Sequence, residues 1–259
     1  MKIASWNVNS LKARLPHLTE WLADAKPDVV ALQETKLEDA KFPVDELAAA
    51  GYRAIFSGQK TYNGVAMLAR AEVKGDFEDV VTDIPQLDDP QRRILAATIG
   101  GVRVVDLYVV NGKAVGDEKY TYKLDWLAKV REFLARELER HPNLVVLGDF
   151  NIAPDDRDVY DPVAWAEDIL CSPPECEALQ RITDLGLHDS FRLFQQDGGH
   201  FSWWDYRQAA FRRNMGLRID LILLGDALKS AARSAEIDRT PRKWERPSDH
   251  TPVTVDLDI

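Results

Sequence analysis

Four short polar signatures in this sequence could do chemistry, because each lies at the edge of an apolar run. They are Asn7 with Asn9, Glu34, Asp149 with Asn151, and Asp249 with His250. Strand-like apolar residues flank all four, so each places carboxylate, amide or imidazole groups at a strand tip, where ligand sites tend to form. Oxygen ligands of this kind suit Mg²⁺ or Mn²⁺, and a single histidine beside them suits phosphoester chemistry.

The pair Asp149 and Asn151 follows the apolar run 144–147. Gly148, between that run and Asp149, permits a close backbone approach. If extended geometry persists, Asn151 points to the same side as Asp149. An Asp and an Asn on one side are what a water-activating base and a water- or phosphate-orienting donor need. A turn is the alternative interpretation, because Asp-x-Asn followed by Pro154 also suits one.

Two further acids invite a role in the same site. Glu34 follows the apolar run 29–32 and could bind a metal ion, although an isolated Glu is more often a surface residue. Asp220 interrupts the apolar run 217–224, where an acid is costly unless it is paired. We expect His250 as its partner, because an Asp–His pair fixes the imidazole tautomer and favours the cation. Arg218 or another arginine is the alternative partner.

Other polar and aromatic residues could contact a phosphorylated polymer. Tyr108 ends an apolar run, with Asn111 and Lys113 behind it, and these groups could hold phosphate oxygens. A partly buried core tyrosine explains Tyr108 equally well. The segment 201–207 joins Trp203 and other large aromatic residues to Arg207, which suits an unstacked nucleotide or an exposed sugar. A core strand would also explain the aromatic residues, and Tyr62 could reach DNA from another loop.

The composition of the 259 residues, 45% hydrophobic and 29% charged, is ordinary for a soluble globular protein. No apolar run approaches the roughly 20 residues of a membrane span. The first strand signal begins at Lys2, so we expect no signal peptide and a cytoplasmic protein. In that compartment Cys171 and Cys176 are expected to be reduced thiols.

The net charge of −10 argues at first against a polyanionic partner. Net charge, however, reports solubility better than it reports a local site. Two basic clusters lie just upstream of Asp220 and Asp249, one with Arg207, Arg212, Arg213 and Arg218, the other with Arg239, Arg242, Lys243 and Arg246. Each could be a solvated face or part of a binding surface.

The remaining pattern predicts one domain over 1–259, with strands and helices mixed throughout. Strands are predicted at 3–8, 29–33, 52–56, 64–70, 94–99, 102–110, 144–147, 217–224 and 251–257. Helices are predicted at 122–138, from near Pro16, at 44–50 and at 175–185, with loops at 155–161 and 173–174. Hairpins beside helical crossovers favour two packed sheets covered by helices over one doubly wound parallel sheet.

The ordered set of segments resembles the exonuclease III family of apurinic/apyrimidinic (AP) endonucleases, within the DNase I-like endonuclease/exonuclease/phosphatase superfamily. The segments are SWNVN, LQETK, YNGVA, LYVVNG, LGDFNIAP, FSWWDYR, GLRIDLIL and RPSDHTPV. Each is modest alone, but the set runs through the whole chain and is highly specific. The resemblance implies an α/β fold, a four-layer αββα sandwich with the site at one edge of its two sheets.

The resemblance also implies roles for individual residues. Glu34 resembles the main Mg²⁺ ligand, with Asn7, Asn9 and Asp249 near the metal, and position 9 departs from relatives that carry Asp there. Asp149 resembles the residue that activates water, Asn151 the residue that orients it, and Tyr108 and the His250–Asp220 pair resemble the groups that contact the phosphate. Trp203, Phe211 and Leu217 fall in the segments that form the abasic-sugar pocket, and Arg212 and Arg213 are expected beside them on the DNA-binding face.

The implied reaction is Mg²⁺-dependent hydrolysis of duplex DNA on the 5′ side of an abasic site, with Mn²⁺ able to substitute. Activity on blocked 3′ ends and 3′→5′ exonuclease activity are expected beside it, in a monomer that works on the nucleoid. One alternative is a predominantly exonucleolytic enzyme, or a superfamily phosphodiesterase with inositol-phosphate or sphingomyelin substrates. A non-catalytic DNA-binding relative is a further alternative, but the intact candidate residues argue against it.

Overall fold

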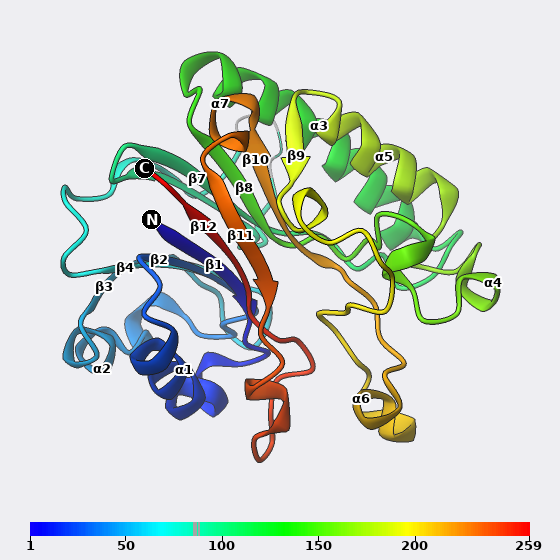
Figure 1. Cartoon of the computed structure of the whole chain (residues 1–259), viewed down its shortest axis with the longest axis horizontal. Helices are drawn as coiled ribbons and strands as arrows, with labels where there is room; N and C mark the ends of the chain where they lie inside the picture. The colour runs from blue at the N-terminus through cyan, green and yellow to red at the C-terminus, as the bar shows by residue number, and fades with distance from the viewer. Residues whose placement is uncertain (85–86, 88) are drawn as a thin grey trace.

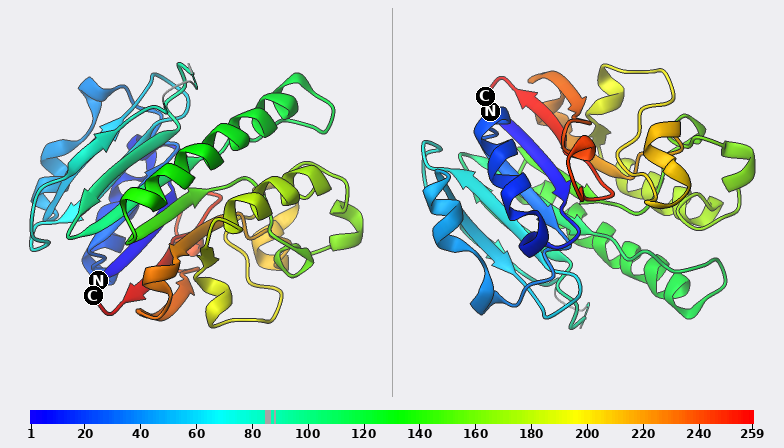
Figure 2. Two further views of the ribbon diagram at one scale, coloured as in Figure 1. Left: turned by 90° about the horizontal axis from the view of Figure 1, so that it is seen from above. Right: turned by 90° about the horizontal axis from the view of Figure 1, so that it is seen from below.

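The computed structural model describes residues 1–84, 87 and 89–259, which form two stacked sheets covered by helices. Figure 1 and the two views of Figure 2 show helices on the outer face of each sheet. The four-layer αββα sandwich predicted from the sequence is therefore confirmed. Among the described residues, no helix has both the length and the apolar character that crossing a bilayer requires.

Each sheet has six strands. The first has the order β11-β12-β1-β2-β4-β3, formed by Ala232–Ile237, Val253–Leu257, Lys2–Asn7, Val29–Gln33, Val65–Arg70 and Tyr52–Ser57. The second has the order β5-β6-β7-β8-β10-β9, formed by Glu78–Val81, Ile94–Ile99, Val102–Tyr108, Leu144–Asp149, Asp220–Gly225 and Leu187–Asp189. Parallel pairs at the centre of each sheet, β1 with β2 and β7 with β8, are flanked by antiparallel neighbours.

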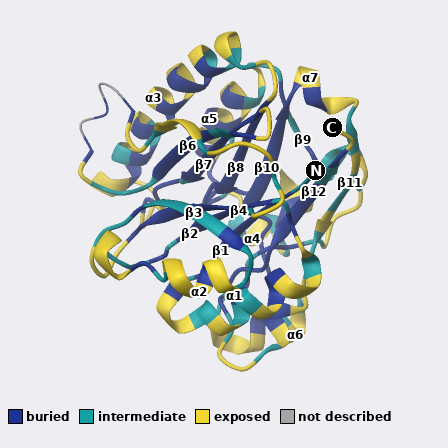
Figure 3. Ribbon diagram, turned by 90° about the vertical axis from the view of Figure 1, so that its left-hand side faces the viewer, coloured by how far each residue is buried: buried dark blue, intermediate teal, exposed yellow. Residues whose placement is uncertain are grey.

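The helices divide between the two outer faces and the connecting loops. They are α1 (Leu11–Ala25), α2 (Val44–Ala49), α3 (Glu118–Arg140), α4 (Pro162–Trp165), α5 (Pro173–Thr183), α6 (Ala210–Arg213) and α7 (Asp226–Lys229). Short 3₁₀ turns occupy Asp39–Lys41, Asp156–Asp158, Phe191–Leu193, Arg207–Ala209 and Pro241–Lys243. Figure 3 shows the central strands buried and the outward faces of the helices exposed.

Alternation along the strands separates three apolar layers. In β1, Ile3 lies between the two sheets, whereas Ala4 and Trp6 pack outward against α1. This is the period of two that any strand buried on both faces shows. On the other side, α3 covers the second sheet with residues such as Leu127 and Leu134. The core between the sheets is therefore shared, and it joins them into one body.

Polar residues replace the apolar ones where the strands end, at one edge of this central core. Asn7 at the end of β1 is opposite Gln33 at the end of β2. In the second sheet, Tyr108 at the end of β7 pairs with Asp149 at the end of β8, and Asp220 at the start of β10 also pairs with Asp149. Because the parallel strands end where the antiparallel β10 begins, these side chains meet at the same edge.

Several predicted boundaries were wrong. Helix α1 begins at Leu11, so Pro16 lies inside it, and its missing N–H costs the helix one backbone hydrogen bond, the one to the carbonyl of Lys12. Pro173 and Pro174 form the first turn of α5 rather than a loop, because their missing N–H groups need no partner there. Asp220 is the first residue of β10 and does not interrupt a strand.

Three strands were missed altogether: β5, β9 and β11. Residues of β5 and β11 are mostly exposed or half-buried, and β9 is three residues long. All three lie at the edge of a sheet. An edge strand buries little apolar surface, so its sequence carries a weak alternation.

Candidate active site

The strand ends bring Glu34, Asp149 and His250 together. One ligand atom from each of them lies within 4.8 Å of the others. Asp149 is 1% exposed and His250 4%, so both charges are removed from bulk water. Among the described residues, this is the group of His, Cys, Asp and Glu side chains with the spacing of a metal site. Two of its members supply carboxylate oxygens, which suit a hard cation.

Asn7 joins the two acids of this group. Its Nδ2 donates to Glu34 Oε1 at 3.0 Å and to Asp149 Oδ2 at 2.9 Å. Its Oδ1 accepts the backbone N–H of Asn9 at 3.0 Å. Ser248 Oγ donates to the carbonyl of Asn7 and so fixes the strand end. The amide therefore turns its nitrogen toward the acids, and its oxygen, the atom that would bind a metal, is already hydrogen-bonded.

Glu34 also has a lysine beside it, Lys36, which the sequence pattern did not single out. Lys36 Nζ lies 2.8 Å from Glu34 Oε2 and donates to Asn9 Oδ1 at 2.6 Å. Both Glu34 and Lys36 have a positive φ, and this bend of the loop turns the two side chains toward each other. Burial opposes ionisation of Glu34, but Lys36, Asn7 and His250 outweigh it and lower its pKa. Glu34 is therefore a carboxylate.

Asp149 is held by donors on several sides. It accepts from Asn7 Nδ2, from the backbone N–H of Asn151 at 2.9 Å and from Asn151 Nδ2 at 3.3 Å. Asn151 has φ 48°, so the extended geometry does not persist, yet its side chain still reaches Asp149. Gly148 makes the close approach that we expected: a Cβ on it would lie 1.9 Å from the carbonyl oxygen of Leu107. Burial raises the pKa of Asp149 to about 7, against the opposing effect of His250 and Asn7.

His250 and Asp220 form the predicted pair. His250 Nδ1 lies 2.9 Å and 3.1 Å from the two carboxylate oxygens of Asp220. Burial alone would lower the pKa of His250, but Asp220 and Asp149 outweigh it and raise that pKa to about 10. The alternative partner Arg218 is bound elsewhere, 2.6 Å from Asp158 Oδ1. The imidazole is therefore a cation whose Nε2 lies 3.7 Å from Asp149 Oδ2.

Tyr108 and Asp249 border this group without belonging to it. Burial and the charge of Glu34 raise the pKa of Tyr108 well above its usual value, so the phenol keeps its proton. Arg93 lies over the ring at 4.6 Å. Asp249 accepts from Asn9 Nδ2 at 2.8 Å and from Trp203 Nε1 at 3.0 Å, which occupies both of its oxygens.

The residues predicted to contact DNA differ in how far they are accessible. Tyr62, Asn111, Lys113, Arg207, Arg212 and Arg213 are exposed, while Trp203 and Phe211 are half-buried. Leu217 is fully buried, as are Trp204 and Arg218, so none of these three has surface to offer in this structure. Arg218 is therefore not part of an exposed basic cluster. Arg242 is also mostly buried and packs over the rings of Tyr206 and Phe211.

Asn111 is tied directly to the candidate site. Its Nδ2 donates to Asn151 Oδ1 at 3.1 Å. Lys113 and Arg207 are instead paired with neighbouring acids, Asp117 at 2.7 Å and Asp205 at 2.6 Å. A cavity of about 260 Å³ opens beside Trp203, with Tyr160 and Trp165 among its lining residues.

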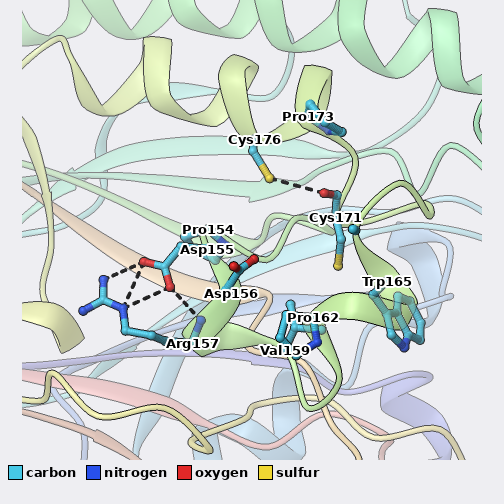
Figure 4. Close-up of a pocket in the computed structure, with 11 residues that line it drawn as sticks. Pro154, Asp155, Asp156, Arg157, Val159, Pro162, Trp165, Cys171, Pro173 and Cys176 are labelled. Carbon is cyan, nitrogen blue, oxygen red and sulfur yellow. Dashed lines mark hydrogen bonds and ion pairs between the residues drawn. The ribbon is translucent and has the colours of Figure 1, made fainter.

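A larger cavity of about 560 Å³ is lined in part by residues 154–157, which follow Asn151 in the sequence (Figure 4). Asp156, Trp165, Cys171 and Cys176 are among its lining residues, and none of the strand-end group is. The two cysteines are free, as predicted. Burial raises the pKa of Cys171 to about 12, so its thiol is not a nucleophile at neutral pH. Size therefore does not identify the reactive site in this molecule.

Comparisons with known proteins agree with the geometry at the strand ends. The model of the Endonuclease/Exonuclease/phosphatase family matches residues 4–250. Exodeoxyribonuclease III of Haemophilus influenzae is 35% identical over 266 residues, which cover 98% of each chain. A solved structure of the 3′ phosphatase NExo from Neisseria, bound to a product DNA hairpin, is 49% identical with a TM-score of 0.97. An AP endonuclease from Archaeoglobus fulgidus is 35% identical with a TM-score of 0.94, and both structures are covered over their whole length, as is this chain.

Proposed function

The chain belongs to the endonuclease/exonuclease/phosphatase family, as a phosphodiester-hydrolysing nuclease of the exonuclease III type, and from this premise we propose that it repairs damaged DNA. Its substrates are duplexes with an abasic site, cut on the 5′ side, and duplexes with a blocked 3′ end. The observation that carries this proposal is the buried Asp149, which faces Glu34 on one side and the His250–Asp220 pair on the other.

Asp149 is the residue that takes a proton from the attacking water. A general base works best when its pKa is near the working pH, and burial brings that of Asp149 to about 7. Asn151 orients the water, because its Nδ2 lies 3.3 Å from Asp149 and its backbone is fixed by the same carboxylate. Asn7 holds Asp149 and Glu34 in place relative to each other by donating to both.

His250 stabilises the negative charge that develops on the phosphate. As a cation it offers its Nε2 proton, because Nδ1 is occupied by Asp220. A preorganised donor of this kind is worth more in a buried site than in water. Tyr108 keeps its proton and can donate to another phosphate oxygen.

The donor set fits Mg²⁺, with Mn²⁺ as a substitute. Glu34 would hold the ion through its carboxylate oxygens and Asp149 beside it accepts the proton of the water, since the protonated His250 has no lone pair to offer. When bound, the ion would polarise the phosphate and help to neutralise its charge. Asn7, Asn9 and Asp249 would stand near the ion, as ligands or as residues that orient its ligands through hydrogen bonds.

Binding of DNA relies on a local surface, because the net charge of the chain is −10. The exposed side chains Tyr62, Asn111, Lys113, Arg207, Arg212 and Arg213 lie on that surface. The damaged nucleotide is held beside Trp203, with Leu217 buried beneath it, and Phe211 packs against Trp204, the next residue. Affinity should fall steeply with salt concentration. We propose a single domain that acts as a monomer in the cytoplasm.

One end-labelled duplex with an abasic site, incubated with Mg²⁺ and then with EDTA, tests this function. Incision gives one shortened product, exonuclease activity gives a ladder, and no Mg²⁺-dependent product would contradict the proposal. A duplex with a 3′-phosphate decides the second candidate, predominant processing of 3′ ends. That candidate is favoured by the 49% identity to a structure described as a 3′ phosphatase. Inositol phosphates and sphingomyelin serve as non-DNA controls.

A further inference from the structure

Lys123 of α3 is a fully buried cation close to the candidate active site. Its Nζ donates to the carbonyl oxygen of Asn151 at 2.7 Å and to that of Asn111 at 3.2 Å. It also pairs with Glu175 of α5, which is equally buried. Burial lowers the pKa of Lys123, and the Glu175 carboxylate opposes that shift. Burying such a charge is costly unless it is paired and fully hydrogen-bonded, so the position calls for a physical reason.

The reason lies in the backbone of the two asparagines. Asn151 has a positive φ, which turns its carbonyl out of the ladder of β8 and toward α3. A buried carbonyl without a partner is expensive, and the Lys123 ammonium supplies that partner. Gly112 lets the lysine stem come close, because a Cβ on Gly112 would lie 3.1 Å from Lys123 Cδ.

The same ammonium therefore joins the two segments whose side chains meet at the site. Asn111 Nδ2 donates to Asn151 Oδ1, while Lys123 binds both of their carbonyl oxygens from behind. We propose that Lys123, held by Glu175, is a positioning residue that sets where the Asn151 amide points relative to Asp149. This inference rests on the proposed function, in which Asn151 orients the attacking water.

Glu175 makes the lysine rigid. Its Oε2 accepts from Ser172 N at 3.2 Å and from Ser172 Oγ at 2.5 Å, and its Oε1 accepts from Leu170 N at 3.2 Å. Four donors thus surround one carboxylate, counting the lysine. A charge network satisfied at every atom keeps a single geometry, which is what a support for a reacting group needs.

The test replaces the pair by apolar residues, so that no lone charge stays buried. In Lys123→Met/Glu175→Leu, kcat should fall about tenfold to a hundredfold with KM changed less than threefold, as for a small misplacement of a reacting group. The matched control is Arg103→Met/Glu137→Leu, which removes another buried pair, 2.5 Å apart, between Arg103 of β7 and Glu137, which lies about four turns from Lys123 along α3. The control should keep kcat within twofold of the unmodified protein.

Hydrogen–deuterium exchange gives a readout that needs no activity. Amides in segments 109–113 and 149–153 should exchange at least tenfold faster in the Lys123→Met/Glu175→Leu variant and unchanged in the control. Equal kcat in variant and unmodified protein, equal loss in both double variants, or unchanged exchange in both segments would overturn the positioning role. If the unmodified protein cleaves neither an abasic nor a 3′-phosphate duplex, the proposed function fails, and exchange alone still decides whether Lys123 fixes these segments.

Discussion

His250 Nδ1 lies 2.9 Å from Asp220 Oδ2 and 3.1 Å from Asp220 Oδ1, and both side chains are almost fully buried. The N–H groups of Ile219 and Asp220 both donate to Ser202 Oγ, which fixes the start of β10 behind the carboxylate. The imidazole therefore has one tautomeric arrangement and one orientation, with Nε2 directed toward Asp149 at 3.7 Å. The site thus holds a carboxylate that must lose its proton, Asp149, beside an imidazole that must keep one, His250.

The rate should depend on pH through this pair. Asp149 must have lost its proton to act as a base, so kcat/KM rises with pH through its pKa of about 7. His250 must keep its proton, so the rate falls as pH passes about 10. A bound divalent cation favours the carboxylate, so increasing Mg²⁺ should move the acidic limb to lower pH. A profile that is flat between pH 6 and 8 at low Mg²⁺ would contradict the assignment of Asp149.

Replacing His250 by Ala should reduce kcat on the order of a hundredfold to a thousandfold, because a preorganised charged donor is lost. Asp220→Asn should lose less and should move the basic limb of the pH profile down, since the neutral amide no longer favours the imidazolium. His188→Ala, in β9 and paired with Asp226, is the control and should keep the rate. A loss below tenfold for His250→Ala would leave His250 with a structural role only.

Asp149→Asn should abolish cleavage and leave binding of DNA largely intact, because the amide keeps the shape of the side chain but cannot accept the proton. Single-turnover cleavage and fluorescence anisotropy with an abasic duplex separate the two effects. The exposed Asp45→Asn on α2 serves as the control. Turnover of Asp149→Asn within tenfold of the unmodified protein would show that Asp149 is not the general base.

The strand-end residues were accessible to sequence analysis, since a buried strand is a visible apolar run and its end is a visible change of polarity. Glu34, Tyr108, Asp149 and His250 were found in this way, and the pairing of His250 with Asp220 was predicted because a buried acid needs a partner. Geometry inside loops was not accessible. The positive φ of Asn151 and the contact of Lys36 with Glu34 depend on turns that the pattern of residue types does not fix.

Lys123 illustrates the signal that was overlooked. It lies on the buried stripe of α3 together with Leu127, Val130 and Leu134, where a charged residue contradicts the apolar period. Such a contradiction predicts a buried partner, but the partner Glu175 lies in another helix, and the pairing depends on tertiary packing. Arg218 failed as a predicted surface residue for the same reason, because its acids come from distant segments.

Removal of divalent metal should stop cleavage, and Mg²⁺ or Mn²⁺ should restore it. Glu34→Gln should raise the Mg²⁺ concentration for half-maximal rate at least tenfold, since a carboxylate ligand becomes neutral. Thermal unfolding gives an independent check: Mg²⁺ should raise the Tm of the unmodified protein and raise that of Glu34→Gln less. Full activity in rigorously metal-free buffer would refute the metal requirement, and an unchanged Mg²⁺ dependence in the variant would refute Glu34 as a ligand.

A last prediction concerns Asp106, which lies fully buried between the two sheets, one layer below the site. Its Oδ1 accepts from Gln33 Nε2 at 2.7 Å, and its Oδ2 has no hydrogen-bond partner among the described residues. Burial raises the pKa of Asp106 well above its usual value, although the bond from Gln33 opposes the shift. The folded protein therefore holds a proton at neutral pH that the unfolded chain releases above about pH 4.

It follows that Asp106 costs stability as pH rises from about 4 toward its folded pKa, because the unfolded state binds fewer protons there. Asp106→Asn removes this dependence, so its free energy of unfolding relative to the unmodified protein should increase steadily between pH 4 and pH 8. Urea unfolding at several pH values measures the difference, with the exposed Asp45→Asn as a variant whose difference stays constant. A difference for Asp106→Asn that is independent of pH would mean that Asp106 is ionised in the folded protein and that its charge is met by a group other than Gln33.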